Sequence, residues 1–280
     1  MPDRASPGSG WGDGAWAAGG IRTLVGCLVA FQLLLALVNL PLMYSDQREN
    51  EHVAMQEAAG RPLAAPAAVT PPMLRSTVAF LKRQVDLDRE DNLATWFPTV
   101  QLAVLGFAAL LLRLVRRRAG WLWIGLGFLY LSADEMAQIH EWVGVRLDAL
   151  GWHLGAMHAP YAWVLLLGPL FLGFALWMIR FVWRETRAEL RLRGVSIVAV
   201  ALLILVLPVE LIGGHLQGTL FHPPRIEVII EETLETMGET LLIGVFLTLA
   251  SRELALRRPA SSGAEAAADL EAHGAGARVA

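Results

Sequence analysis

The chain has 280 residues, of which 55% are hydrophobic and 18% charged, and its mean hydropathy is +0.48. This composition is typical of polytopic membrane proteins and excludes an ordinary soluble enzyme. The single cysteine, Cys27, excludes an intramolecular disulfide and a Cys-based metal site. The net charge is −3, and the basic clusters are short and lack interleaved aromatic residues, so they favour membrane lipid over nucleic acid as a partner.

Six apolar runs, each about 20 residues long, predict six membrane-spanning helices. In chain order the runs cover residues 21–43, 97–115, 120–141, 160–183, 195–214 and 226–250. The first run exceeds the apolar core of a signal peptide and is followed by no cleavage site, so we expect it to be retained. The fold class that follows is all-α: a polytopic membrane helix bundle with six transmembrane helices.

Arginine clusters follow the second, fourth and sixth runs. By the positive-inside rule these three connections are cytoplasmic, which places both termini inside the cell and the connection 44–96 outside. We therefore expect a multi-pass protein of the bacterial cytoplasmic (inner) membrane. The clusters are Arg113, Arg116, Arg117 and Arg118; Arg180, Arg184, Arg187, Arg191 and Arg193; and Arg252, Arg257 and Arg258.

Composition also divides the chain outside the runs. Residues 1–20 and 259–280 are rich in Gly, Ala and Ser and are predicted to be disordered cytoplasmic tails, flanking a six-span membrane domain at 21–258. Within the external loop 44–96, the apolar spacing of residues 73–85 predicts an amphipathic helix that lies on the membrane or caps the bundle. No internal repeat is evident, which argues against many transporter folds.

The third and sixth runs contain carboxylates that membrane helices rarely have. The third ends in Asp134, Glu135, His140 and Glu141, and the predicted topology puts this end in the outer half of the membrane together with the start of the sixth run. The acids of the sixth run are Glu227, Glu231, Glu232, Glu235 and Glu239. An ionisable group at bilayer depth costs several kcal/mol and by default indicates function.

Helical geometry, at about 100° per residue, decides which of these side chains can share a face. All five acids of the sixth run lie on one stripe. In the third run Asp134 and Glu141 can point at one centre, whereas Glu135 and His140 lie on opposite flanks and cannot both join them. The outer half of the fifth run adds Glu210, just after a proline, and His215.

Several carboxylates with an imidazole form a ligand set for a divalent metal ion. We expect Glu231, as proton acceptor, and Glu135 to act in catalysis. The expected metal ligands are Asp134, His140, Glu141, Glu232, Glu235 and Glu239. Neither helix has the Glu-x-x-His spacing of ferritin-type di-iron sites. Without a cation some carboxylates would be protonated and could couple proton movement to transport.

Two structural explanations stand beside these interpretations. The acids could form a buried hydrogen-bond network that only fixes helix packing. Tryptophans near the ends of the runs are explained by the aromatic belt of a membrane interface. These are Trp96, Trp121, Trp123, Trp142, Trp152, Trp163 and Trp183.

Three motifs together resemble a group of uncharacterised bacterial multipass membrane proteins. They are Glu90-x-Asn92-x-x-Thr95-Trp96, then Ser132-x-Asp134-Glu135 with His140-Glu141, then Glu231-Glu232-x-x-Glu235-x-x-Gly238. The resemblance covers about 88–250. It implies that Glu90, Asn92, Thr95 and Trp96 belong to the same external site, and it brings no known reaction.

The leading hypothesis is an integral membrane enzyme, a hydrolase or group transferase, whose metal-dependent site opens outward and acts on a lipid or lipid-linked substrate. The alternatives are a cation- or proton-coupled transporter and a non-catalytic membrane sensor or assembly protein. The sequence leaves open whether the protein is an enzyme.

Overall fold

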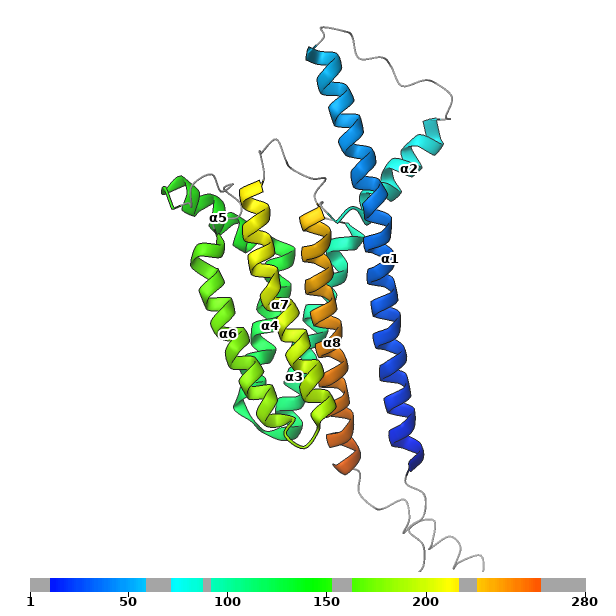
Figure 1. Ribbon diagram of the computed structural model, residues 1–280. Coiled ribbons are helices and arrows are strands. Elements are labelled where there is room, and N and C mark those ends of the chain that lie inside the picture. The colour runs from blue at the N-terminus through cyan, green and yellow to red at the C-terminus, as the bar shows by residue number, and fades with distance from the viewer. Residues whose placement is uncertain (1–10, 59–71, 88–91, 153–162, 217–225, 258–280) are drawn as a thin grey trace, which may run out of the picture.

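The computed structural model describes residues 11–58, 72–87, 92–152, 163–216 and 226–257, and its elements are helices (Figure 1). They are α1 (Trp11–Ala58), α2 (Pro72–Val85), α3 (Leu93–Arg116), α4 (Ala119–Ala137), α5 (Ile139–Ala149), α6 (Trp163–Glu185), α7 (Leu190–Leu216) and α8 (Ile226–Arg257). The predicted all-helical fold is confirmed.

Four helices in the described part of the chain are long and apolar enough to cross a membrane. They are Gly19–Leu42 within α1, the whole of α3 and α6, and Leu190–Gly213 within α7. The third and sixth runs correspond to α4 and α8, which do not meet this measure by length and composition. Both carry carboxylates, α4 in its last turn and α8 in its first half, and these lower their hydropathy.

Both ends of α1 differ from those expected, whereas α2 agrees with expectation. α1 has 48 residues rather than the predicted 21–43, so it extends into the predicted tail at one end and the predicted loop at the other. Residues 44–58 contain neither Gly nor Pro and are rich in Glu, Gln and Ala, so the helix continues until the proline-rich stretch. α2 begins within one residue of the predicted amphipathic helix at 73–85.

The third expected run is not one helix, and the prediction of a continuous span 120–141 is wrong at its end. α4 ends at Ala137, Gln138 adopts the left-handed conformation with φ 52°, and α5 starts at Ile139. A break of this kind leaves amide groups of the next helix without partners. Here Asp134 Oδ1 accepts a hydrogen bond from the backbone N–H of His140 at 3.0 Å.

An apolar cluster fills one end of the bundle formed by α3, α4, α6, α7 and α8. Trp121 is completely buried in it and makes edge contacts with Phe181 and Phe246, each with ring centroids 5.2 Å apart. At the same end Arg116 forms ion pairs with Glu185 on α6 and Glu253 on α8. This end of the bundle is therefore closed by packing and by ion pairs.

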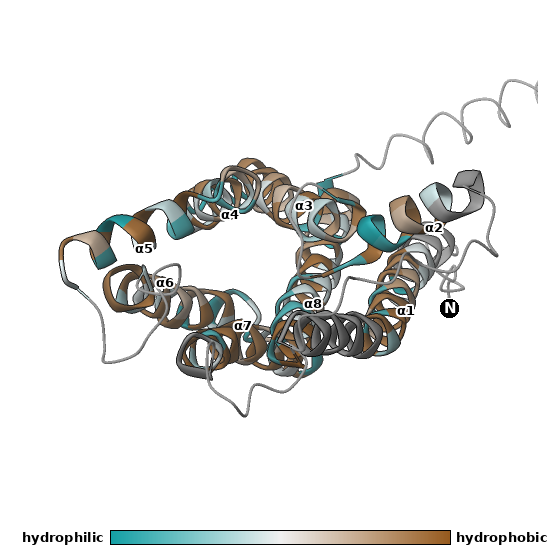
Figure 2. Ribbon diagram, turned by 90° about the horizontal axis from the view of Figure 1, so that it is seen from above, coloured by the Kyte–Doolittle hydropathy of each residue, from teal (hydrophilic) through white to brown (hydrophobic). Residues whose placement is uncertain are grey.

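α1 lies at the periphery, beside α8 (Figures 1 and 2). Gln32 Nε2 donates to Thr240 Oγ1 at 3.0 Å, and Thr240 Oγ1 donates to Gln101 Oε1 on α3 at 2.8 Å. Further along α1, Asn39 donates to the carbonyl of Val85 and accepts from the N–H of Leu87. Two buried amides thus attach α1 to the other helices.

Candidate functional site

A cavity of about 430 Å³ lies toward the end of the bundle away from the Arg116 ion pairs, and residues of the apolar cluster form part of its lining. The residues that line it come from α4, α5, α6, α7 and α8, together with single residues of α3 and of the segment before it. Eight ionisable side chains predicted as site residues are among them: Asp134, Glu135, His140, Glu141, Glu210, Glu231, Glu232 and Glu235. The antiparallel helices therefore bring both acid clusters to one space.

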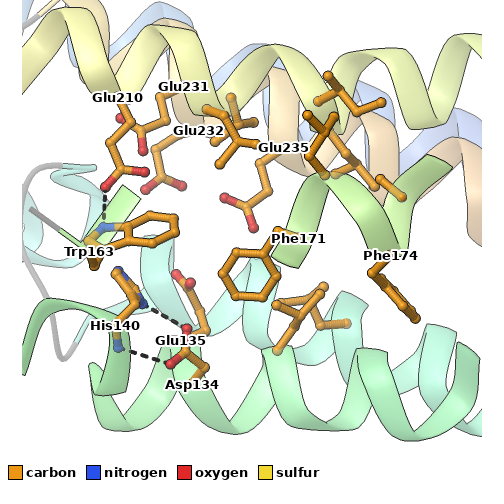
Figure 3. A pocket seen from close by; sticks show the side chains of 18 of the residues that line it. Asp134, Glu135, His140, Trp163, Phe171, Phe174, Glu210, Glu231, Glu232 and Glu235 are labelled. Carbon is orange, nitrogen blue, oxygen red and sulfur yellow. Dashed lines mark hydrogen bonds and ion pairs between the residues drawn. The ribbon is translucent and has the colours of Figure 1, made fainter. Parts of the chain in front are cut away.

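The ionisable groups form two walls that face each other across the cavity (Figure 3). One wall, the α4–α5 wall, carries Asp134, Glu135, His140 and Glu141. The other, the α7–α8 wall, carries Glu210, Glu231, Glu232 and Glu235. Phe171 of α6 lies between the two walls in this view.

The best-defined geometry in the α4–α5 wall is the pair Asp134–His140. Asp134 Oδ2 lies 2.7 Å from His140 Nδ1, and Asp134 Oδ1 accepts from the His140 backbone. Asp134 is 5% exposed. Helix extrapolation had put His140 on the flank of the run, away from Asp134, and the break at Gln138 brings the two together. A carboxylate bonded to Nδ1 fixes the ring and leaves Nε2 as the other nitrogen for chemistry.

The pKa of His140 is raised above 6.5. Burial by itself lowers the pKa, but the hydrogen bond to Asp134 and the negative charges of Asp134, Glu135 and Glu141 outweigh it. α5, which carries His140, is not among the candidate membrane spans. The ring therefore gains its proton more readily than a free histidine.

Trp163 connects the two walls. Its Nε1 donates a 2.7 Å hydrogen bond to Glu210 Oε1, and its ring lies edge-on to His140 with centroids 5.0 Å apart. Trp163 is 6% exposed and Glu210 8% exposed. The interpretation of Trp163 as part of an interfacial belt is wrong, because its indole N–H donates to a buried carboxylate inside the protein. Trp121 is buried as well, whereas the other five tryptophans of that set are exposed or half-buried.

The deeper part of the cavity is apolar. Its lining includes Phe128, Phe174, Met178, Leu203 and Ile204. These residues could not be recognised from the sequence, because an apolar side chain on a membrane helix gives the same pattern whether it faces lipid, core or cavity. One cavity therefore has an ionisable part and a hydrocarbon part.

The other predicted site residues lie elsewhere. Glu239 is completely buried one turn along α8 from Glu235, does not line the cavity, and has no partner for either carboxylate oxygen in the described part of the chain. Asn92 caps α3 by accepting from the N–H of Thr95, and Trp96 is exposed. None of the four residues Asn92, Thr95, Trp96 and Glu239 lines the cavity.

Two predicted residues are not described at side-chain level. Glu90 lies outside the described residues, and so does the side chain of His215 near the end of α7. Their part in a site stays a prediction.

Within the described ranges, no group of three or more His, Cys, Asp or Glu side chains is arranged to hold a metal ion. The predicted ligands are divided between the two walls, with Glu239 behind one of them. As they stand, these residues do not fit a metal centre.

The fold and the cavity define an all-helical protein with candidate membrane spans and an acid-lined internal pocket. The chain belongs to the family described as "Domain of unknown function (DUF8692)", whose model matches residues 63–250. No curated protein and no solved structure matches the chain. The matched region includes both walls of the cavity and leaves out α1.

Proposed function

We propose that the protein is an integral membrane enzyme, a hydrolase or group transferase, that acts on a lipid or lipid-linked substrate inside the cavity. The proposal is supported by one observation: a single cavity of about 430 Å³ is lined by the two ionisable walls and, in its deeper part, by aromatic and aliphatic side chains, which form an apolar floor. An amphiphile would place its hydrocarbon part against Phe174 and Met178 and its polar end between the walls. A purely structural network needs no such space.

The two walls supply the groups for general acid–base catalysis. In a hydrolysis, His140 Nε2 takes a proton from the attacking water while Asp134 holds the ring through Nδ1. A carboxyl group of the opposite wall gives a proton to the departing oxygen or nitrogen. We assign this step to Glu231, which the sequence analysis took as the proton acceptor, because His140 fills the acceptor role in this proposal. Return of the His140 proton to Glu231 restores both groups. In group transfer an acceptor hydroxyl replaces the water.

The membrane arrangement that we propose keeps six spans, with both termini in the cytoplasm and the cavity at the outer end. The arginine clusters support it, because Arg116 and Arg252 lie at the end that the apolar cluster closes. A coupled transporter is the alternative. The closed apolar end favours the enzyme, since a carrier must open its site to both sides in turn.

The reaction steps above use only the residues of the chain. A divalent cation, expected from the sequence, would have to draw side chains of both walls together, because they do not converge as they stand. Elemental analysis of the purified protein tests whether a metal is nevertheless present.

The enzyme proposal is tested by conversion of lipid. The purified protein is reconstituted into liposomes that contain a bacterial lipid extract, and products are identified by mass spectrometry. Wild-type protein should change at least one lipid class, and His140→Gln and Glu231→Gln should each abolish the change. Asp148→Asn is the control: it removes a carboxylate from α5 that does not line the cavity. Equal conversion by wild type and His140→Gln would refute the mechanism.

A further inference from the structure

The cavity has an excess of negative groups and little to balance it. Among the described residues that line it, seven are carboxylates and His140 alone can carry a positive charge. Neither Lys nor Arg is among the lining residues in the described part of the chain. The basic side chains Arg116 and Arg252 are paired with other acids at the opposite end of the bundle. An anionic ligand would therefore enter a field of its own sign.

Glu210 is a buried residue with a fixed position in the cavity wall, not a solvated surface acid. It is 8% exposed, and Trp163 holds its Oε1 through a 2.7 Å bond. The side chain also lines the cavity. Figure 3 shows it on the same side of the space as Glu231 and Glu235. A largely buried carboxylate that lines a cavity is suited to accept from a ligand donor, preferably a charged one.

Aromatic rings lie among the carboxylates. Trp163 and Phe171 are in edge contact, with centroids 5.7 Å apart, and both line the cavity together with Phe128 and Phe174. The faces of aromatic rings attract cations, and rings combined with carboxylates recognise alkylated ammonium groups. A hydrated metal ion would gain nothing from the rings, whereas an organic cation would contact both.

We propose that the ligand of the cavity is an amphiphile with an ammonium group at its polar end, held between the two carboxylate walls and against Trp163 and Phe171. This inference rests on the proposed function and names the substrate class of the same site. The ammonium group donates to Glu210 and Glu235, and the hydrocarbon chain packs on the apolar floor. The positive charge that balances the walls is then brought by the substrate itself.

Binding of three matched probes tests the proposal. Radiolabelled dodecylammonium, dodecanol and dodecyl phosphate share one chain and differ in the charge of the head group, and binding is measured in uncharged maltoside micelles. The ammonium probe should bind at least about tenfold more tightly than the alcohol, the factor that about 1.4 kcal/mol of charge interaction supplies. Glu235→Gln should reduce the preference to less than about threefold and leave dodecanol binding unchanged, which also shows that the variant is folded.

Two further variants separate charge from ring contacts. Phe171→Leu keeps an apolar side chain but removes the ring, so it should weaken ammonium binding and spare the alcohol. Asp148→Asn removes a carboxylate outside the cavity and should change neither. Equal binding of alcohol and ammonium, or unchanged preference in Glu235→Gln, would overturn the proposal.

The outcomes distinguish this inference from the enzyme proposal. If dodecyl phosphate binds more tightly, alone or only with added Mn²⁺, the ammonium proposal fails and a lipid enzyme with a different substrate remains. If the ammonium probe binds as expected but no lipid is converted by the reconstituted protein, the substrate class stands as a ligand class and the enzyme proposal fails.

Discussion

Replacement of Asp134 by Asn should switch the proton of His140 from one ring nitrogen to the other. The carboxylate accepts two hydrogen bonds, from the backbone N–H of His140 at 3.0 Å and from Nδ1 at 2.7 Å. A carboxamide has one acceptor oxygen and one donor nitrogen. If its oxygen keeps the backbone bond, its amino group faces Nδ1, which must then accept. The ring proton moves to Nε2, and Nε2 can no longer take a proton from a nucleophile.

The cost to stability follows from the two bonds. One charge-assisted bond worth about 1.5–3 kcal/mol is exchanged for a neutral bond of about 0.5–1.5 kcal/mol, a loss of about 1–1.5 kcal/mol. For a chain of this size that lowers Tm by about 2–6 °C. The loss of activity should be much larger, at least about 100-fold, because a positioned general base contributes that much or more. The fold should survive while the reaction stops.

Three measurements check this prediction: Tm in detergent, lipid conversion, and the nitrogen chemical shifts of His140 by NMR. Wild type should show the proton on Nδ1 and Asp134→Asn the proton on Nε2. Asp148→Asn removes the same charge from α5 and should leave all three unchanged. Activity of Asp134→Asn close to that of wild type, with the proton on Nε2, would refute the role given to His140.

Four further predictions concern the charged groups and the membrane arrangement. The proposed reaction needs a neutral His140, so activity should fall as the pH decreases through the pKa of His140, which lies above 6.5. Because the pKa is raised in the folded protein, the stabilisation from His140 should be complete below pH 6.5 and lost as the pH rises through the folded pKa. Activity and Tm measured over a pH series test both statements. Glu239→Met should raise Tm, since it removes two unpartnered buried oxygens whose burial costs about 1–3 kcal/mol, and a lower Tm would indicate a bound partner. In a Cys27→Ser background, Trp152→Cys should react with an impermeant thiol reagent in intact cells and Leu256→Cys should not, both positions being exposed at 58% and 82%; the reverse pattern would invert the proposed topology. If the positive charge of the substrate balances the carboxylates of the two walls, a chelator should leave the Tm of the purified protein unchanged. A fall in Tm that added metal reverses would favour the divalent cation expected from the sequence.

The meeting of the two acid clusters could be predicted from the sequence, because the topology expected from the arginine clusters makes the third and sixth apolar runs cross in opposite directions. Asp134 near the end of one and Glu235 in the first half of the other then fall at the same depth. The pairing of Asp134 with His140 could not be predicted, since it depends on one residue, Gln138, in a left-handed conformation that glycine would have signalled. The division of the predicted ligands into two walls depends in the same way on tertiary packing.

Contacts between polar residues of different apolar runs could not be predicted from the sequence. Gln32, Gln101 and Thr240 are uncharged and lie on three helices far apart in the sequence, so no spacing linked them, yet they form one buried chain of hydrogen bonds. Trp163 was assigned to the membrane interface because it lies at the end of a run, and only the position of Glu210 on α7 reveals its partner. Side chains that pair across helices far apart in sequence leave no periodic pattern.

The side-chain amides of Gln32 and Asn39 fix the position of α1 along the other helices. Gln32 and Asn39 are seven residues apart, nearly two turns, or a rise of about 10.5 Å. Each has a partner on a different part of the protein, Thr240 on α8 and the chain around Val85 and Leu87. A slide of α1 by one turn would break both sets of bonds at once, and lipid tails offer no replacement. These bonds therefore fix both the position of α1 along the bundle and its rotation, and with them the direction in which α1 extends past the bundle at the cavity end (Figure 1).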